Sequence, residues 1–149
     1  MTKRLLRQLA TAFSTIFLAG TVLLGTAAPA TSSLTDTALP VTLVNQLNDV
    51  RAAYHRPRLM VNPRLVAAAT AKAERLLEEQ RFDHRLTDGR TPWVFIHAAG
   101  YHYELAGENL AMDFSNPTML TNAWLASPSH RANMLDPAFT DVGIAIASG

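Results

Sequence analysis

Apolar positions recur at the three- and four-residue spacing of a helix face in two segments of the first half of the chain. Residues 41–55 are expected to form one amphipathic helix, and the Ala-, Leu- and Glu-rich residues 64–80 a second one. Asn62 and Pro63 suit the N-cap and the first helical position of the second helix. The apolar faces consist of Leu43, Leu47, Val50 and Tyr54 in the first helix and of Leu65, Ala69, Ala73 and Leu76 in the second.

Pairs of a capping residue and a proline predict three shorter helices in the second half, and two apolar runs predict strands. The helices are expected to begin at Pro92, Pro117 and Pro128. One strand is expected after Gly107 and another over residues 142–147. Because an isolated two-stranded sheet is marginal, we expect an intact domain to continue with one more strand of about 5–6 residues. Both tryptophans of the chain are expected in the core.

The first 30 residues have the composition of a secretory signal. Basic residues lie within positions 1–7, an apolar stretch follows at 9–24, and Ala28-Pro29-Ala30 supplies the small residues that precede a cleavage site. We expect cleavage after Ala30. A retained membrane anchor is the alternative, because the apolar stretch approaches the ~20 residues that span a bilayer. Residues 31–40 then form a polar linker and residues 41–149 one domain, which lies outside the cytoplasm in either case.

The charge and the cysteine content narrow the classes of function. Three of the 13 basic residues and none of the 12 acidic residues lie in the signal segment, which leaves 10 against 12 and a net charge near −2 for the rest. This balance argues against nucleic-acid binding, which requires a basic surface to neutralise phosphates. The chain has no cysteine, so packing alone must stabilise this exported domain. Such a domain fits a bacterial envelope or secreted protein.

Four segments in order along the chain form a recognisable set: FDH at 82–84, GENLA at 107–111, WLASPSHRANML at 124–135 and FTDVGIAIA at 139–147. With AGY at 99–101 and an opening helix that holds Asn48 and Arg51, the chain resembles the CAP superfamily of cysteine-rich secretory, antigen 5 and pathogenesis-related proteins. The likeness is closer to the cysteine-free bacterial branch with an SCP domain. It implies an α+β fold, an α-β-α sandwich with a small antiparallel sheet between helices. From the unpartnered terminal strand, we expect the end of this sheet to be truncated here.

The resemblance also implies a cleft that collects two histidines and two acids from distant parts of the chain. His84 and His130 match the two histidines, and Glu108 matches the first acid. Ser127 holds the position of the second acid, which is a departure from the family's pattern. Asn133 lies about one helical turn after His130 and is expected on the same side of its helix.

These side chains are compatible with more than one kind of chemistry. His84 and His130 are candidate ligands of Zn²⁺ or another divalent cation, bound weakly because two protein ligands are fewer than stable sites use. Glu108 would then orient a ring or a metal-bound water. Without a metal, Glu108 and His130 are a candidate acid/base pair. Asp141 is a less favoured substitute for the missing acid.

Structural roles are the alternative for the same residues. Ser127 has an adequate explanation as an N-cap before Pro128. Glu108 between a glycine and an asparagine is equally suited to accept backbone hydrogen bonds in a turn. His84 follows the end of a predicted helix, where a ring nitrogen caps carbonyl groups.

Binding is the favoured function, because no nucleophile and base can be paired in the sequence. The expected protein is exported to the cell envelope or secretome and binds a small molecule, a lipid or a cell-wall glycan or peptide fragment in a groove. A metal-assisted or acid/base hydrolase of envelope peptides or glycans is the alternative, and a structural or signalling protein recognised through its surface is the third. We expect a monomer that meets the membrane only through its signal segment.

Overall fold

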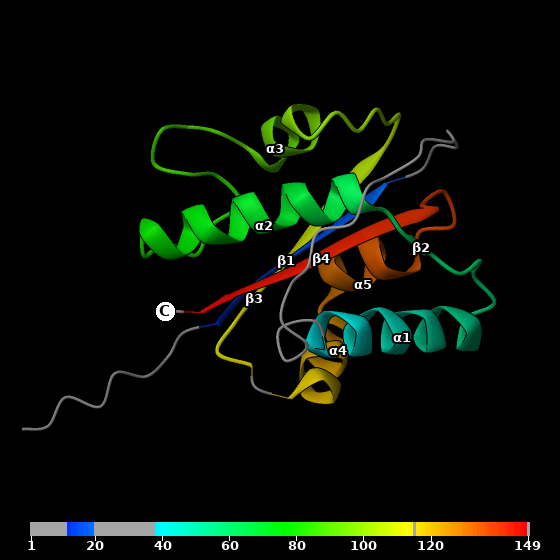
Figure 1. Cartoon of the computed structure of the whole chain (residues 1–149). Coiled ribbons are helices and arrows are strands. Elements are labelled where there is room, and N and C mark those ends of the chain that lie inside the picture. Colours follow the sequence, from blue (N-terminus) through cyan, green and yellow to red (C-terminus); the bar gives the residue numbers. More distant parts are fainter. Residues whose placement is uncertain (1–11, 20–37, 115, 149) are drawn as a thin grey trace, which may run out of the picture.

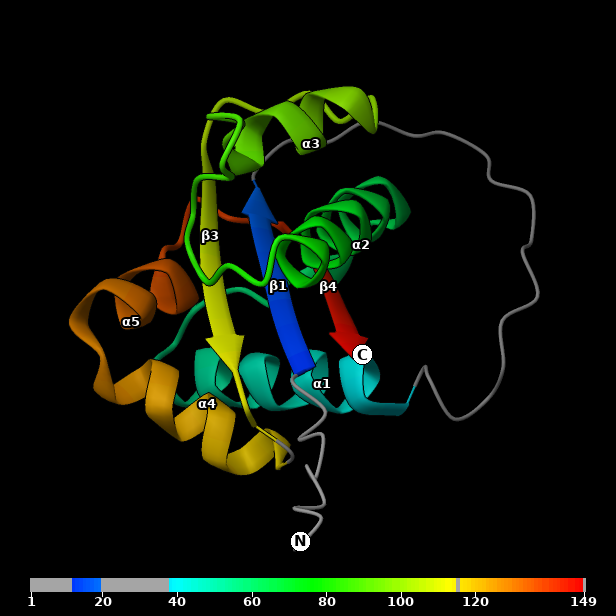
Figure 2. The same cartoon turned by 90° about the vertical axis from the view of Figure 1, so that its left-hand side faces the viewer.

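Helices and strands form three layers in the computed structural model, which describes residues 12–19, 38–114 and 116–148 (Figure 1). Helices α2 (Pro63–Glu78) and α3 (Pro92–Ala98) cover one face of the sheet. Helices α1 (Ala38–Ala53), α4 (Pro117–Ala126) and α5 (Pro128–Leu135) cover the other face, and Figure 2 shows the same layers after a quarter turn. The predicted α-β-α sandwich is confirmed.

The sheet contains its strands in the order β2-β4-β1-β3. Strand β1 (Ala12–Ala19) runs antiparallel to β3 (Ala106–Met112) on one side and to β4 (Asp141–Ser148) on the other. The short β2 (Met60–Val61) pairs in parallel with the start of β4. Strands β3 and β4 therefore run in the same direction on either side of β1, and β3 forms one edge of the described sheet.

Strand β1 lies within the sheet, whereas the sequence indicated a secretory signal for this segment. Residues 12–19 belong to the apolar stretch of the predicted signal, yet their backbone pairs along the whole of β4. The long antiparallel partner of β4 thus precedes it in the chain, whereas a strand that follows it was expected. The predicted cleavage site after Ala30 and residues 31–37 of the linker lie outside the described residues, whereas residues 38–40 belong to α1. None of the helices within the described ranges is long and apolar enough to cross a membrane.

Two hydrophobic clusters pack on opposite faces of the sheet. On β3, Leu110 belongs to the cluster that includes α2 and α3, whereas Ala111 belongs to the cluster that includes α1, α4 and α5. On β4, Ala145 and Ile144 divide between the two clusters in the same way. This division follows from the two-residue period of a strand, which also decides the face to which each polar residue of β3 turns.

Gly143 allows α2 to lie directly on β4. A Cβ atom at this position would lie 2.2 Å from the carbonyl carbon of Leu65 and 2.4 Å from its oxygen. Because carbon atoms in contact are normally about 3.5–4.0 Å apart, only glycine permits this approach. The close packing sets the height of α2 above the sheet, and with it the place of the side chains that α2 turns toward β3.

The inner face of α1 is different from the predicted one. The helix buries Asn48 and Arg51 beside its two leucines, whereas Tyr54 is exposed and Val50 is only half-buried. Asn48 is satisfied inside the protein, because it donates to the carbonyl of Leu59 at 3.1 Å and accepts from the amide of Leu59 at 2.7 Å. Hydrogen bonds to specific backbone groups thus allow polar side chains to be buried on this face of α1, which the spacing of apolar residues did not predict.

In the described part of the chain, side chains of α4 and α5 cover the outer edge of β3. The indole Nε1 of Trp124 donates to the carbonyl of Leu110 at 3.0 Å. The amide Nδ2 of Asn133 donates to the carbonyl of Glu108 at 3.1 Å. These contacts satisfy backbone acceptors that an edge strand otherwise exposes, and they bring α5 against the strand that holds Glu108.

Candidate functional site

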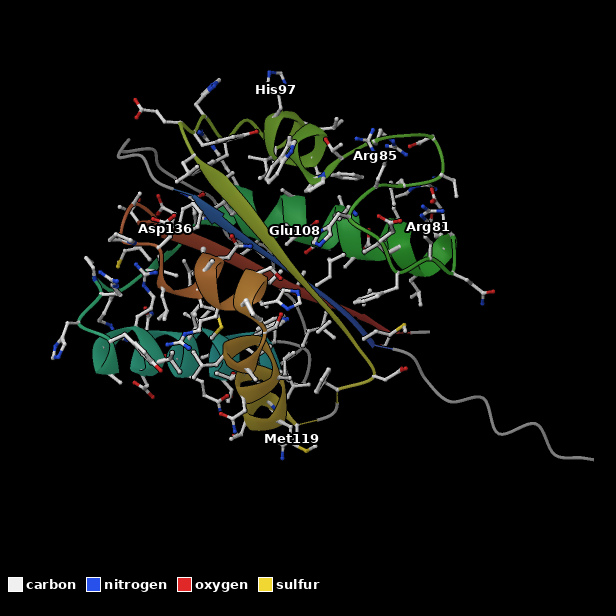
Figure 3. All side chains as sticks on the ribbon, turned by 180° about the vertical axis from the view of Figure 1, so that it is seen from behind. Arg81, Arg85, His97, Glu108, Met119 and Asp136 are labelled. Atoms are coloured by element: carbon white, nitrogen blue, oxygen red, sulfur yellow. The ribbon has the colours of Figure 1, made fainter. Side chains whose placement is uncertain are left out.

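Side-chain alternation along β3 places two polar residues on opposite faces of the sheet. Glu108 turns toward α2 and lies near the centre of the molecule (Figure 3). Its neighbour Asn109 turns toward α5, where its Nδ2 donates to the carbonyl of His130 at 3.1 Å and its Oδ1 accepts from Asn133 at 2.8 Å. Because α5 holds both Asn109 and the carbonyl of Glu108, it fixes this part of β3 in position.

The loop after α2 brings His84 to Glu108. Nδ1 of His84 lies 2.6 Å from Oε2 of Glu108. Asp83 orients the loop, because its carboxylate accepts from the amide of Arg85 at 3.0 Å and from the guanidinium of Arg81 at 2.8 Å. The side chain of Glu108 is 2% exposed and that of His84 is 58% exposed, so the pair joins a buried carboxylate to a ring that reaches solvent.

Both members of this pair hold a proton more tightly than usual. The hydrogen bond to Glu108 raises the pKa of His84 above its ordinary value. Burial raises the pKa of Glu108, although the hydrogen bond to His84 and the charge of Lys72 act in the opposite direction. With Nδ1 occupied by the carboxylate, the ring has Nε2 left to donate to a ligand or accept from it.

Lys72 is a third member of the site, and its residue type gave no hint of this role. It is fully buried on the inner face of α2, with Nζ 4.0 Å from Oε1 of Glu108 and 3.2 Å from the carbonyl of Asp83, to which it donates. Burial lowers the pKa of Lys72, and the charge of Glu108 opposes that effect. The spacing in the sequence could have revealed that Lys72 is buried, because it lies seven residues after Leu65 and four before Leu76 on the predicted apolar face of the helix.

An open pocket of about 360 Å³ lies beside the His84–Glu108 pair. Asn133 and the pair contribute polar groups to its lining, and Pro92 and Trp93 contribute apolar surface. Trp93 is therefore not in the predicted core: it is 38% exposed, in contrast to the buried Trp124. The remaining lining residues are Arg85, Thr91, Ala106 and Gly107. A concave site with mixed polar and aromatic lining is typical of small-ligand binding.

His130 lies near this pocket but is not among its lining residues. Its ring packs against Trp124, with the ring centroids 6.5 Å apart. Burial lowers the pKa of His130, and the charge of His84 lowers it further. The two histidines thus influence each other electrostatically. Of the two rings, His84 makes the hydrogen bond to Glu108 that is found among the described residues.

Ser127 and Asp141 have structural contacts. Ser127 takes the predicted N-cap position of α5 but makes no cap hydrogen bond with its side chain, whose Oγ lies 3.5 Å from Oγ of Ser129. Asp141 accepts a hydrogen bond of 2.7 Å from the hydroxyl of Tyr101. Neither residue lines the pocket.

The groups around the pocket do not match the ligand set of a stable zinc site. Such sites use three or four protein ligands. Among the described residues, no three His, Cys, Asp or Glu side chains gather closely enough to hold a metal ion. The carboxylate of Glu108 also faces the ammonium of Lys72 at 4.0 Å. The weak cation site at His84 and His130 stays a prediction.

Comparison with known sequences identifies relatives over most of the chain. Residues 44–149 match the family model described as the cysteine-rich secretory protein family, CAP. The uncharacterized protein YkwD of Bacillus subtilis (strain 168) is 30% identical over 126 residues, which is 78% of this chain and 49% of that protein. The chain thus spans about half the length of the curated relative that it matches.

Two solved structures are similar in fold. An extracellular protein containing an SCP domain from Bacillus anthracis matches with a TM-score of 0.72 at 22% identity, covering 80% of this chain and 41% of that one. An outer surface protein from Borrelia burgdorferi matches with a TM-score of 0.66 at 21% identity, covering 79% of this chain and 95% of that one. At these identities the similarity concerns the fold.

Proposed function

Because the chain belongs to the cysteine-rich secretory protein (CAP) family, we propose that it is a binding protein that works outside the cytoplasm. The observation on which this rests is a pocket in which a hydrogen-bonded His84–Glu108 pair lies beside an exposed Trp93. The location is supported by the two similar folds, one from an extracellular protein and one from an outer surface protein.

The pocket limits the size and the chemistry of the ligand. About 360 Å³ lies near the lower end of the ~300–1,000 Å³ of small-molecule sites, so the pocket takes a headgroup, one sugar or one peptide side chain. Pro92 and Trp93 offer a surface for an acyl segment or a sugar face. His84 offers a ring nitrogen for the ligand's polar group. The proposed ligand is therefore an amphipathic fragment of a lipid, glycan or peptide.

Tryptophan fluorescence tests this function directly, because Trp93 forms part of the pocket wall. The probes are a lysophospholipid below its micelle concentration, an N-acetylglucosamine oligosaccharide and a tripeptide. We expect one class to give a saturable change that Trp93→Phe abolishes and that His84→Gln weakens by about tenfold, as expected when a ligand hydrogen bond is lost. His97→Gln is the matched control, since His97 lies on the outer side of α3 away from Glu108 (Figure 3). The absence of a saturable response to all three probes refutes the proposal.

Hydrolysis is the second candidate, favoured by the His84–Glu108 contact alone. A buried carboxylate on Nδ1 orients an imidazole so that Nε2 can act as a general base toward water. If the protein acts in this way, turnover of peptide or glycan fragments falls by at least about 10²-fold in Glu108→Gln, while the fluorescence response to the bound fragment persists. Unchanged turnover in this variant excludes the pair as the catalytic group.

A further inference from the structure

The second oxygen of Glu108 is the unusual feature of this site. Oε2 is held by His84, whereas Oε1 is buried and has no hydrogen-bond partner among the described residues. Nζ of Lys72 lies 4.0 Å from Oε1. Lys72 itself is fully buried and donates at 3.2 Å to the carbonyl of Asp83. A carboxylate that is 2% exposed and an ammonium that is 0% exposed thus face each other.

A divalent cation bound through Oε1 would have to lie close to this ammonium. Repulsion between charges is strong where water is excluded, because the effective dielectric constant is far below that of water. Lys72 has no route to solvent, since its side chain points inward from α2 against the sheet and is 0% exposed. The ammonium also supplies the compensation that a buried carboxylate requires. Glu108 can therefore hold His84 in place without a metal.

We propose that Lys72 is the resident cation of this pocket and that it excludes a divalent metal from the His84–Glu108 pair. Lys72 is then a specificity-determining residue: it makes the pocket a metal-independent site, and its replacement by a neutral side chain creates affinity for zinc. The inference concerns the pocket of the proposed function but does not depend on its ligand, because zinc alone is the probe.

Calorimetric zinc titration of the full chain tests this inference. We expect Lys72→Met to bind Zn²⁺ at least about tenfold more tightly than the wild type, with a matching rise in the thermal midpoint when zinc is present. Lys72→Met combined with Glu108→Gln should return to the affinity of the wild type, because the carboxylate ligand is lost. Arg58→Met is the matched control, since it removes an exposed positive charge that does not line the pocket.

Several outcomes decide against the inference. Zinc binding by the wild type that is as tight as in Lys72→Met overturns it, as does an increase of equal size in Arg58→Met. If circular dichroism shows that Lys72→Met is unfolded, Lys72→Gln replaces it in the titration. Should both unfold, the wild type still decides: stoichiometric zinc binding that both His84→Gln and Glu108→Gln abolish contradicts exclusion by Lys72, and negligible binding supports it. None of these results depends on whether a lipid, glycan or peptide binds the pocket.

Discussion

Replacement of Arg51 by methionine is expected to remove a large part of the stability of this domain. The guanidinium of Arg51 is completely buried, and within the described residues it donates to four backbone carbonyl groups. These are the carbonyls of Pro57 at 2.7 Å, Met134 at 2.8 Å, Asp136 at 3.0 Å and Phe139 at 3.2 Å. One side chain thus joins the end of α1 to the end of α5 and to the loop before β4.

The size of the expected loss in the free energy of unfolding follows from the groups that the substitution leaves without a hydrogen bond. Methionine fills part of the volume but donates no hydrogen bond, so it leaves two buried and two partly buried carbonyls without this donor. Each unsatisfied buried group costs about 1–3 kcal/mol, while removal of a buried charge recovers part of the total. We therefore expect a loss of about 3–5 kcal/mol, against a total stability of about 5–15 kcal/mol for an ordinary domain.

Urea unfolding followed by far-ultraviolet circular dichroism measures this loss. Arg51→Lys should be destabilised nearly as much, because a lysine ammonium cannot reproduce the planar, five-donor geometry of a guanidinium. Arg58→Met, at an exposed position, should lie within about 0.5 kcal/mol of the wild type. A loss of less than about 1 kcal/mol in Arg51→Met would refute the argument that these four hydrogen bonds hold the elements together.

Three further predictions concern the sheet and the site. Gly143→Ala places a Cβ 2.2 Å from the backbone of Leu65 and should cost more than the ~1–3 kcal/mol of ordinary overpacking, whereas a folded variant of unchanged thermal midpoint would contradict the close approach. The pKa of His84 is raised in the folded state, so its stabilising effect is complete below the unfolded value of about 6.5 and is lost as the pH rises through the folded value. The stability difference between the wild type and His84→Gln should therefore be largest near pH 6 and shrink toward pH 9 (about 2.5 units above the unfolded pKa); a difference that grows with pH has the wrong sign. A chain that begins at Thr31 lacks β1, which pairs with both β3 and β4, and should lose cooperative unfolding; equal stability with and without residues 1–30 would show that β1 contributes nothing.

Local signals explain why the helices were predicted well. Asn62 caps α2 by accepting from the amide of Arg64, and Asn116 caps α4 in the same way through Thr118 and Met119. These contacts join residues two or three positions apart, so the pattern that forms them is visible in the sequence. The strands over β3 and β4 were also predicted, because their apolar runs are bounded by turn residues.

Long-range contacts explain the predictions that were wrong. The apolar stripe of α1 favoured Val50 and Tyr54, but Asn48 and Arg51 are buried in their place because distant backbone groups satisfy them. Trp93 was expected in the core and instead lines a pocket. In each case, contacts with another helix, strand or loop decide whether the side chain is buried. The spacing of apolar residues within one helix contains no information on those contacts.

The amino-acid sequence by itself determined the helices, through local patterns, and the family and sandwich architecture, through its ordered motifs. The resemblance to the family also led us to expect His84 and Glu108 in one cleft, and the structure shows their contact. Only the tertiary structure decided that residues 12–19 pair between β3 and β4, that His130 stays outside the lining of the pocket and that Lys72 faces Glu108. Strand pairing and the compensation of a buried charge depend on which distant groups come into contact, and folding of the whole chain sets those contacts.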